Sequence, residues 1–115
     1  TVLCDRFTDA SFAYQCAGRG LSREKLQLLN QNFVSHMPAL TFWLDAPIEL
    51  GMSRARERGA LDRFEQEKVT FFEKVRAGYQ ELWQVEPERI KRLDATQSPD
   101  LVFAEALKYL QTVAA

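Results

Sequence analysis

Apolar residues occur along this chain in two patterns, as short runs and as longer stretches with a helical repeat. The runs are Val2–Cys4 and Leu40–Leu44, and an aspartate follows each of them; the short segment Ile90–Asp94 likewise ends on an aspartate. A short apolar run of this kind is typical of a strand that is covered on both faces in a parallel sheet. The pattern therefore predicts three parallel strands.

Apolar residues three or four positions apart predict the helices. Ser22 is a suitable N-cap for a helix that carries Leu26, Leu29 and Phe33, and Pro38 closes this segment. Further helices are predicted over 10–17, from Pro47 toward Arg58, from Phe64 until Pro87, and from Ser98 and Pro99 through about Leu110. The alternation of strands and helices predicts one α/β domain over residues 1–115, with a parallel sheet flanked by helices.

Charge and composition narrow the possible partners. Fifteen Lys and Arg residues stand against sixteen Asp and Glu, which leaves a formal charge of −1. The chain therefore has no overall positive field for nucleic acid or an anionic membrane, and any anion must be bound by a local cluster. The sequence also has no apolar stretch of roughly 18 residues and no signal-peptide pattern at its start, so we expect a cytoplasmic protein.

The cysteines and the first residues add two further expectations. Cys4, Cys16 and His36 are too few for a four-ligand zinc site, and the spacing of the cysteines does not indicate a disulfide framework. We expect reduced thiols. The sequence opens inside a predicted strand without an initiator Met, so we also expect a fragment of a longer protein.

The first candidate site follows the first predicted strand. Ligands bind beyond the carboxyl ends of strands in open parallel sheets, and Asp5 and Arg6 stand at such an end. An arginine can hold a phosphate bidentately, and an aspartate can order a metal-bound water. The alternative is an aspartate that caps the next turn beside a surface arginine.

Tyr14 and Gln15 stand near two glycines and are consistent either with a base pocket or with ordinary packing.

The second candidate site is a group of arginines around Gly59. Arg54, Arg56, Arg58 and Arg63 alternate with acidic residues there. A mobile loop rich in arginine suits phosphoryl transfer, in which the protein contributes mostly positioning and charge stabilisation. The alternative is a solvated helix face with local ion pairs.

Taken in order, several motifs of the chain resemble bacterial thymidylate kinase. They are Asp5–Phe7, Ser11–Gln15, Gly18–Leu21, Trp43–Asp45, Arg54–Glu65 and Asp94–Thr96. The resemblance covers essentially the whole chain and corresponds to the second half of that enzyme. It implies part of a three-layer P-loop kinase fold that moves the γ-phosphoryl group of ATP to dTMP with Mg²⁺, in a cytoplasmic homodimer.

The resemblance also implies roles for the residues of the first site. Arg6 would hold the phosphate of the acceptor, and Asp5 would help to organise the phosphates and, through water, the magnesium ion. Tyr14 would lie under the deoxyribose and disfavour a 2′-hydroxyl. Ser11 and Gln15 would face the edge of the thymine.

The remaining roles fall on an arginine-rich lid at about residues 54–65 and on the loop after the last strand. Arg54 matches an arginine near the adenine of ATP. The candidates for contacting the transferring phosphates are Arg56, Arg58 and Arg63. The residues that would border the adenine are Ala95, Thr96 and Gln97.

One motif of the family is absent from these residues. The sequence contains no GxxxxGK[ST], and therefore neither the backbone cradle nor the lysine that binds ATP phosphates. The family orders its strands 2-3-1-4-5, so a P-loop strand would lie between the first two strands predicted here. We expect this chain alone to be inactive. The alternatives are a non-catalytic nucleotide-binding or interaction chain, and a related nucleoside monophosphate kinase with another base specificity.

Overall fold

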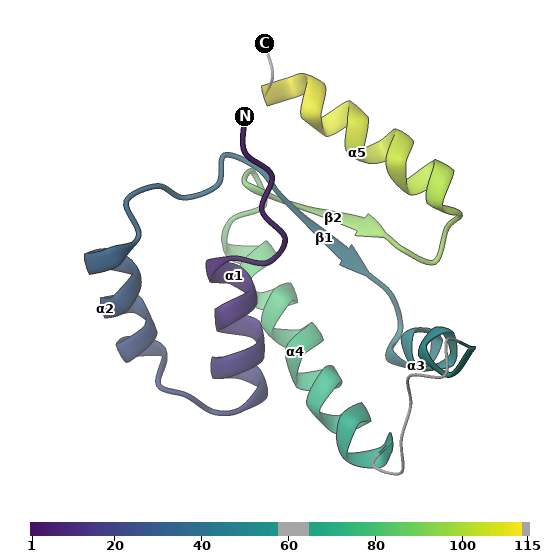
Figure 1. Cartoon of the computed structure of the whole chain (residues 1–115), viewed down its shortest axis with the longest axis horizontal. Helices are drawn as coiled ribbons and strands as arrows, with labels where there is room; N and C mark the ends of the chain where they lie inside the picture. Colours follow the sequence, from purple (N-terminus) through teal and green to yellow (C-terminus); the bar gives the residue numbers. More distant parts are fainter. Residues whose placement is uncertain (58–64, 114–115) are drawn as a thin grey trace.

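The computed structural model describes residues 1–57 and 65–113, and it contains a parallel pair of strands (Figure 1). The strands are β1 (Thr41–Asp45) and β2 (Ile90–Asp94), with Thr41 opposite Ile90 and Asp45 opposite Asp94. A parallel pair needs a long crossover, which helices α3 and α4 supply here. The α/β class and the last two predicted strands are therefore confirmed.

Four of the helices match the predicted segments. They are α2 (Arg23–Phe33), α3 (Ile48–Glu57), α4 (Glu65–Val85) and α5 (Pro99–Val113). Ser22 caps α2 as predicted, because its Oγ accepts a hydrogen bond from the Lys25 amide at 3.3 Å. Ser98 does the same for α5, with the Leu101 amide at 3.4 Å. Within the described ranges, none of the helices is long and apolar enough to cross a membrane.

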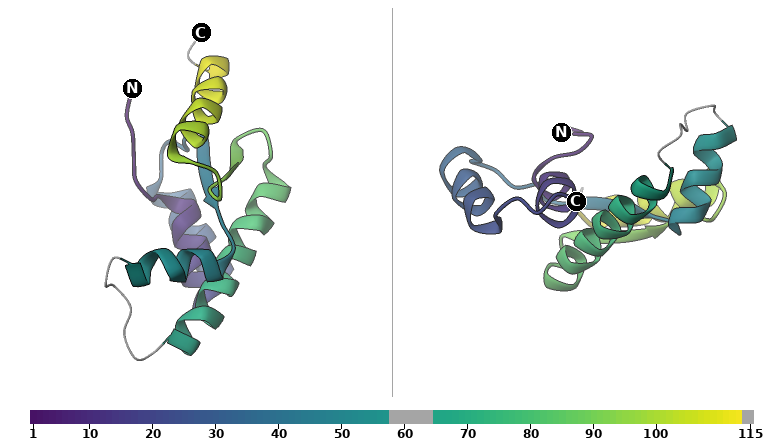
Figure 2. Two further views of the ribbon diagram at one scale, coloured as in Figure 1. Left: turned by 90° about the vertical axis from the view of Figure 1, so that its right-hand side faces the viewer. Right: turned by 90° about the horizontal axis from the view of Figure 1, so that it is seen from below.

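The two longest helices, α4 and α5, pack on opposite faces of the strand pair (Figure 2). Trp43 stacks on Tyr79 of α4 with ring centroids 6.1 Å apart. Its neighbour Phe42 points the other way and meets Tyr109 of α5 at 6.5 Å. Side chains alternate between the faces of a strand, so each helix covers one face. Leu93, the most buried large side chain, is 1% exposed.

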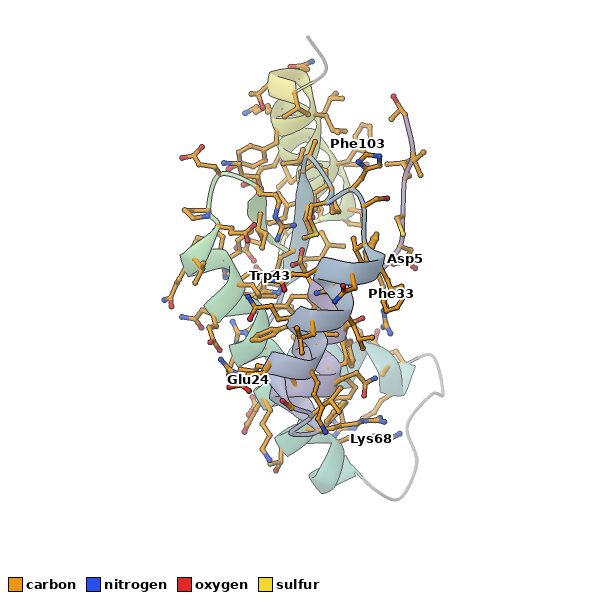
Figure 3. The ribbon with its side chains drawn as sticks, turned by 90° about the vertical axis from the view of Figure 1, so that its left-hand side faces the viewer. Asp5, Glu24, Phe33, Trp43, Lys68 and Phe103 are labelled. Carbon is orange, nitrogen blue, oxygen red and sulfur yellow. The ribbon has the colours of Figure 1, made fainter. Side chains whose placement is uncertain are left out.

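The apolar residues that predicted α2 do not pack into this core. Leu29 is 52% exposed and Phe33 is 80% exposed, and Phe103 of α5 is 67% exposed. Figure 3 labels Phe33 on α2 and Phe103 on α5. The spacing of these residues predicted the helix correctly, but the apolar face of α2 is exposed.

The first predicted strand, Val2–Cys4, is wrong for this structure. Residues 1–4 have no regular structure, and Val2 and Leu3 are 90% and 91% exposed. A strand is stable only where a neighbouring strand pairs with its backbone groups, and within the described ranges none lies beside this segment. The apolar run alone could not supply that partner.

The predicted short helix over 10–17 is longer than expected and has an unusual form. It begins as α1 (Thr8–Ser11) and continues as the π-helix η1 (Phe12–Gly18). Together α1 and η1 lie between α4 and α2, and η1 packs directly against α4 (Figure 1). At the crossing with α4, Gly78 faces the backbone of η1. A Cβ atom at Gly78 would lie 2.7 Å from the Ala17 Cβ and 3.1 Å from the Ala13 Cα.

This close approach predicts that Gly78→Ala destabilises the chain. The added methyl group would meet the Ala17 methyl group and the Ala13 backbone, neither of which can rotate away, so overpacking should lower the free energy of unfolding by about 1–3 kcal/mol. Gly51→Ala is the matched control, because a Cβ there meets nothing within 4 Å. It should leave stability unchanged or raise it by up to about 1 kcal/mol. Urea unfolding of the two variants compares them, and equal effects would contradict the packing described here.

Candidate functional site

A pocket of about 780 Å³ lies beside α1 and η1 and contains all four predicted acceptor-binding residues. Arg6, Ser11, Tyr14 and Gln15 line it together. The other lining residues are Cys4, Phe7, Thr8, Ala10, Arg19, Asn30 and Val34. The structure therefore joins the loop before α1, the helix that follows and one side of α2 into a single concave site. Arg19 and Asn30 were not predicted from the sequence, although Gly18 and Gly20 on either side of Arg19 marked that turn.

Arg6 reaches Tyr14 because the backbone turns sharply at this position. Its φ of 65° is in the left-handed region, which non-glycine residues rarely adopt and which costs about 1–3 kcal/mol. The guanidinium carbon lies 4.8 Å from the centre of the Tyr14 ring. Nη2 also donates a hydrogen bond to the Tyr14 Oη at 3.5 Å. The turn thus places the guanidinium against the aromatic ring inside the pocket.

Tyr14 is in turn supported by the aromatic residues on α4. Its ring meets Tyr79 edge-on, with centroids 6.3 Å apart and planes at 82°. Tyr79 stacks on Trp43 of β1, so an aromatic column connects the pocket to the sheet. Burial, together with the nearby Tyr14, raises the pKa of Tyr79 to about 12. Tyr79 therefore stays neutral at physiological pH and keeps its hydroxyl proton.

The charge of the pocket favours an anion. Arg6 and Arg19 line it, and the lining residues in the described part of the chain include no carboxylate. The Arg19 guanidinium lies 5.2 Å from the centre of the Phe71 ring, which holds it near the end of η1. Two guanidinium groups in one partly enclosed site suit a phosphate or another anionic ligand.

Asp5 is exposed and lies next to the pocket, outside its lining as far as the structure describes the chain. Its carboxylate provides the hard oxygen atoms that Mg²⁺ prefers, commonly through retained waters. In residues 1–57 and 65–113, no group of three or more His, Cys, Asp or Glu side chains forms a ready metal site. An indirect magnesium contact through Asp5 stays a prediction.

The structure brings the predicted adenine-binding residues together at the end of β2. Arg54 of α3 donates a hydrogen bond from Nη1 to the Ala95 carbonyl oxygen at 2.9 Å. Asp94 Oδ1 accepts hydrogen bonds from both the amide and the hydroxyl of Thr96, and these bonds lower the pKa of Asp94. Gln97 donates from Nε2 to the Asp94 carbonyl at 3.1 Å. The loop is thus ordered, and Arg54 joins it to α3.

The predicted lid is described only in part. Arg56 is exposed in the last turn of α3. Arg58 and Arg63, together with Gly59, lie outside the described residues. Their proposed contacts with phosphates stay predictions.

Two clusters of partly buried charges were not identified from the sequence. Asp45 is 3% exposed and accepts hydrogen bonds from Arg76 of α4 and from Arg92 of β2. Asp9 of α1 pairs with Arg89, which precedes β2. Asp45 ended a predicted strand, but nothing in the spacing of these residues indicated their partners.

A parallel strand pair flanked by helices, with an arginine-bearing pocket beside α1 and η1, defines an α/β protein with a candidate phosphate-binding site. The family model described as thymidylate kinase matches residues 1–106. The chain belongs to the thymidylate kinase family. Thymidylate kinases are P-loop kinases, so the predicted family and fold are confirmed.

Three relatives, each named thymidylate kinase, illustrate the similarity. The chain is 83% identical over 109 residues to the thymidylate kinase of Acinetobacter baumannii strain ATCC 17978. The matched residues make up 95% of this chain and 55% of the relative. The relative from Acinetobacter baylyi is 75% identical over 112 residues, which are 97% of this chain and 55% of the relative. The relative from Teredinibacter turnerae is 56% identical over 99 residues, which are 84% of this chain and 47% of the relative. The chain therefore spans about half the length of these relatives.

Proposed function

We propose that this chain provides the acceptor site and part of the donor site of a thymidylate kinase. The full-length enzyme would transfer the γ-phosphoryl group of ATP to dTMP and release dTDP and ADP. The observation that supports this most strongly is the pocket in which Arg6 lies against Tyr14, with Ser11 and Gln15 in the same lining. Membership of the thymidylate kinase family supports the choice of substrates.

The acceptor site would bind dTMP by its phosphate, sugar and base. Arg6 holds the phosphate, because its planar fork of donors matches two phosphate oxygens. Tyr14 lies under the deoxyribose and leaves no room for a 2′-hydroxyl. Ser11 and Gln15 offer hydrogen-bonding groups to the edge of the thymine. Together these contacts orient one phosphate oxygen toward ATP.

The donor side would use the lid and the loop after β2. Arg54 and the loop Ala95–Gln97 contact the adenine, and Arg54 already meets this loop at Ala95. Arg56, Arg58 and Arg63 offset the charge on the transferring phosphoryl group. Asp5 orders water around the magnesium site. When bound with the nucleotide, Mg²⁺ neutralises phosphate charge.

The reaction needs positioning and charge stabilisation rather than a covalent role for the protein. A phosphate oxygen of dTMP forms a bond to the γ-phosphorus of ATP. The bond from that phosphorus to the oxygen bridging the β- and γ-phosphates breaks, and that oxygen leaves with ADP. Arg6 fixes the attacking group, and the lid arginines stabilise the charge that develops. The P-loop would come from the other half of the enzyme.

We also propose that the full-length enzyme is a cytoplasmic homodimer that binds neither nucleic acid nor membranes. The near-neutral formal charge of −1 supports the absence of a nucleic-acid or membrane partner. The exposed apolar residues of α2, where Leu29 is 52% and Phe33 is 80% exposed, offer surface for a subunit contact.

The function is tested in a full-length enzyme in which this chain replaces the matching segment of the Acinetobacter baumannii relative. We call this enzyme the chimera. It should phosphorylate dTMP with ATP and Mg²⁺ and should prefer dTMP in a panel of nucleoside monophosphates, whereas residues 1–115 alone should show no turnover. Preference for another monophosphate would favour a related kinase. Absence of turnover in a folded chimera would favour a non-catalytic role.

The role of Tyr14 predicts a loss of sugar discrimination in Tyr14→Phe. The Tyr14 hydroxyl meets Arg6 Nη2 at 3.5 Å, so its removal should loosen the part of the pocket that excludes a 2′-hydroxyl. We expect the ratio of kcat/KM for dTMP to that for its ribose counterpart to fall roughly tenfold in the chimera. Tyr109→Phe is the control, because Tyr109 packs against Phe42 on the other face of the sheet. An unchanged ratio in Tyr14→Phe would assign the discrimination to the ring or to another residue.

A further inference from the structure

An ion pair outside the pocket joins the acceptor-binding helix to the sheet. Asp9 Oδ2 and Oδ1 accept hydrogen bonds from Arg89 Nη1 and Nη2 at 2.8 and 2.9 Å. The two residues are 80 positions apart in the sequence, and their side chains are only 12% and 15% exposed. In the described part of the chain, neither side chain lines the pocket.

Arg89 is itself held at the beginning of the strand pair. Its side chain also donates to the Thr41 Oγ1 at 3.2 Å and pairs with Glu86. Its carbonyl oxygen accepts a hydrogen bond from the Thr41 amide at 2.9 Å, where β1 begins. The guanidinium donates two hydrogen bonds to Asp9, one to Thr41 and one to Glu86, which leave it little rotational freedom, so Asp9 is bound to a fixed point of the sheet.

In the sequence, Asp9 lies between Arg6 and Tyr14, whose side chains are in contact in the pocket. Arg6 precedes it in the strained turn, and Tyr14 follows it in η1. α1 has only four residues, so a fixed Asp9 also fixes the orientation of its neighbours on both sides.

We infer that the Asp9–Arg89 pair is a positioning device for the acceptor site, an inference that rests on the proposed function. The pair holds α1 against β1 and β2 so that Arg6 and Tyr14 meet the monophosphate in the correct orientation. Its main contribution is to orientation, since desolvation of a buried pair largely offsets its attraction. A misplacement of about 1 Å can cost roughly a hundredfold in rate.

The test compares three variants of the chimera. Asp9→Asn removes one charge, and Arg89→Lys keeps the charge but loses the fork. The double variant Asp9→Leu with Arg89→Met removes both charges, which commonly preserves stability because no unpaired charge stays buried. For the double variant we expect the KM for dTMP to rise at least tenfold, while the KM for ATP changes less than twofold. In Arg89→Lys the KM for dTMP should rise less than in the double variant, because the positive charge is kept.

Glu81→Gln provides the control. It breaks the bidentate pair between Arg23 and Glu81, which joins α2 to α4 and is exposed at both side chains. Both KM values should stay within twofold. Equal increases of both KM values in the double variant, or no increase in either, would overturn the positioning role. Failure of the unsubstituted chimera to use dTMP would instead refute the proposed function, so the two failures are distinguishable.

Discussion

Replacing Arg6 by alanine should raise the KM of the chimera for dTMP by about 10- to 100-fold. The substitution removes a charge-assisted contact with the acceptor phosphate, and such contacts contribute about 1.5–3 kcal/mol. The KM for ATP should change less than twofold, because the loss falls on one substrate. Arg6→Lys should recover the affinity only in part, since an ammonium group lacks the planar fork. Steady-state kinetics with each substrate varied in turn measures both constants.

Arg23→Ala is the matched control for this prediction. Arg23 is an exposed arginine on α2 whose partner is Glu81, and its removal should leave both KM values within twofold. Equal loss of affinity for dTMP and ATP in Arg6→Ala, with a lower melting temperature, would indicate a folding defect. A normal KM for dTMP would show that Arg6 does not hold the acceptor phosphate.

Replacing Asp45 by asparagine should lower the free energy of unfolding of the chimera by about 2–3 kcal/mol at pH 7. The carboxylate is 3% exposed and binds two guanidinium groups, Arg76 at 2.8 and 3.1 Å and Arg92 at 2.8 Å. Loss of one partner of a buried pair can cost 3–5 kcal/mol. We expect a loss below this range because the side chains of Arg76 and Arg92 are 38% and 36% exposed, so water solvates them when the carboxylate is removed.

This cluster also predicts the direction of a pH effect. Burial alone would raise the pKa of Asp45, but the hydrogen bonds and charges of Arg76 and Arg92 outweigh it and lower that pKa. A lowered pKa in the folded state gives stability that is present above the unfolded pKa of about 3.9 and is lost as the pH falls through the folded value. The stability difference between the unsubstituted chimera and Asp45→Asn should therefore shrink below about pH 4.

Urea unfolding at pH 7 and pH 3 measures this difference. Asp100→Asn is the control, because Asp100 is exposed in the first turn of α5 and should contribute less than about 1 kcal/mol. If Asp45→Asn is as stable as the unsubstituted chimera at pH 7, the cluster does not stabilise the carboxyl ends of β1 and β2.

The sequence predicted the local elements well because their causes are local. Ser22 and Ser98 cap helices wherever those helices form, and the apolar run that contains Trp43 suits a covered strand. The first predicted strand failed because pairing depends on a neighbour that the described residues do not supply. The uncovered face of α2 has a similar cause: periodicity identifies a helix but does not show what packs against it.

The site residues required a different kind of information. Motif order suggested Arg6, Ser11, Tyr14 and Gln15, and the structure places all four in one pocket. The Asp9–Arg89 pair could not be predicted, because its members are 80 residues apart and neither belongs to a recognisable pattern. Arg19 was missed for another reason, since an exposed arginine between two glycines is also typical of an ordinary surface turn.

A crystal structure of the chimera with bound dTMP tests the central proposal most directly. We expect the phosphate within hydrogen-bonding distance of the Arg6 guanidinium, the sugar over the Tyr14 ring, and the thymine beside Ser11 and Gln15. A dTMP molecule bound elsewhere, with Arg6 still in contact with Tyr14 alone, would contradict the assignment of this pocket as the acceptor site.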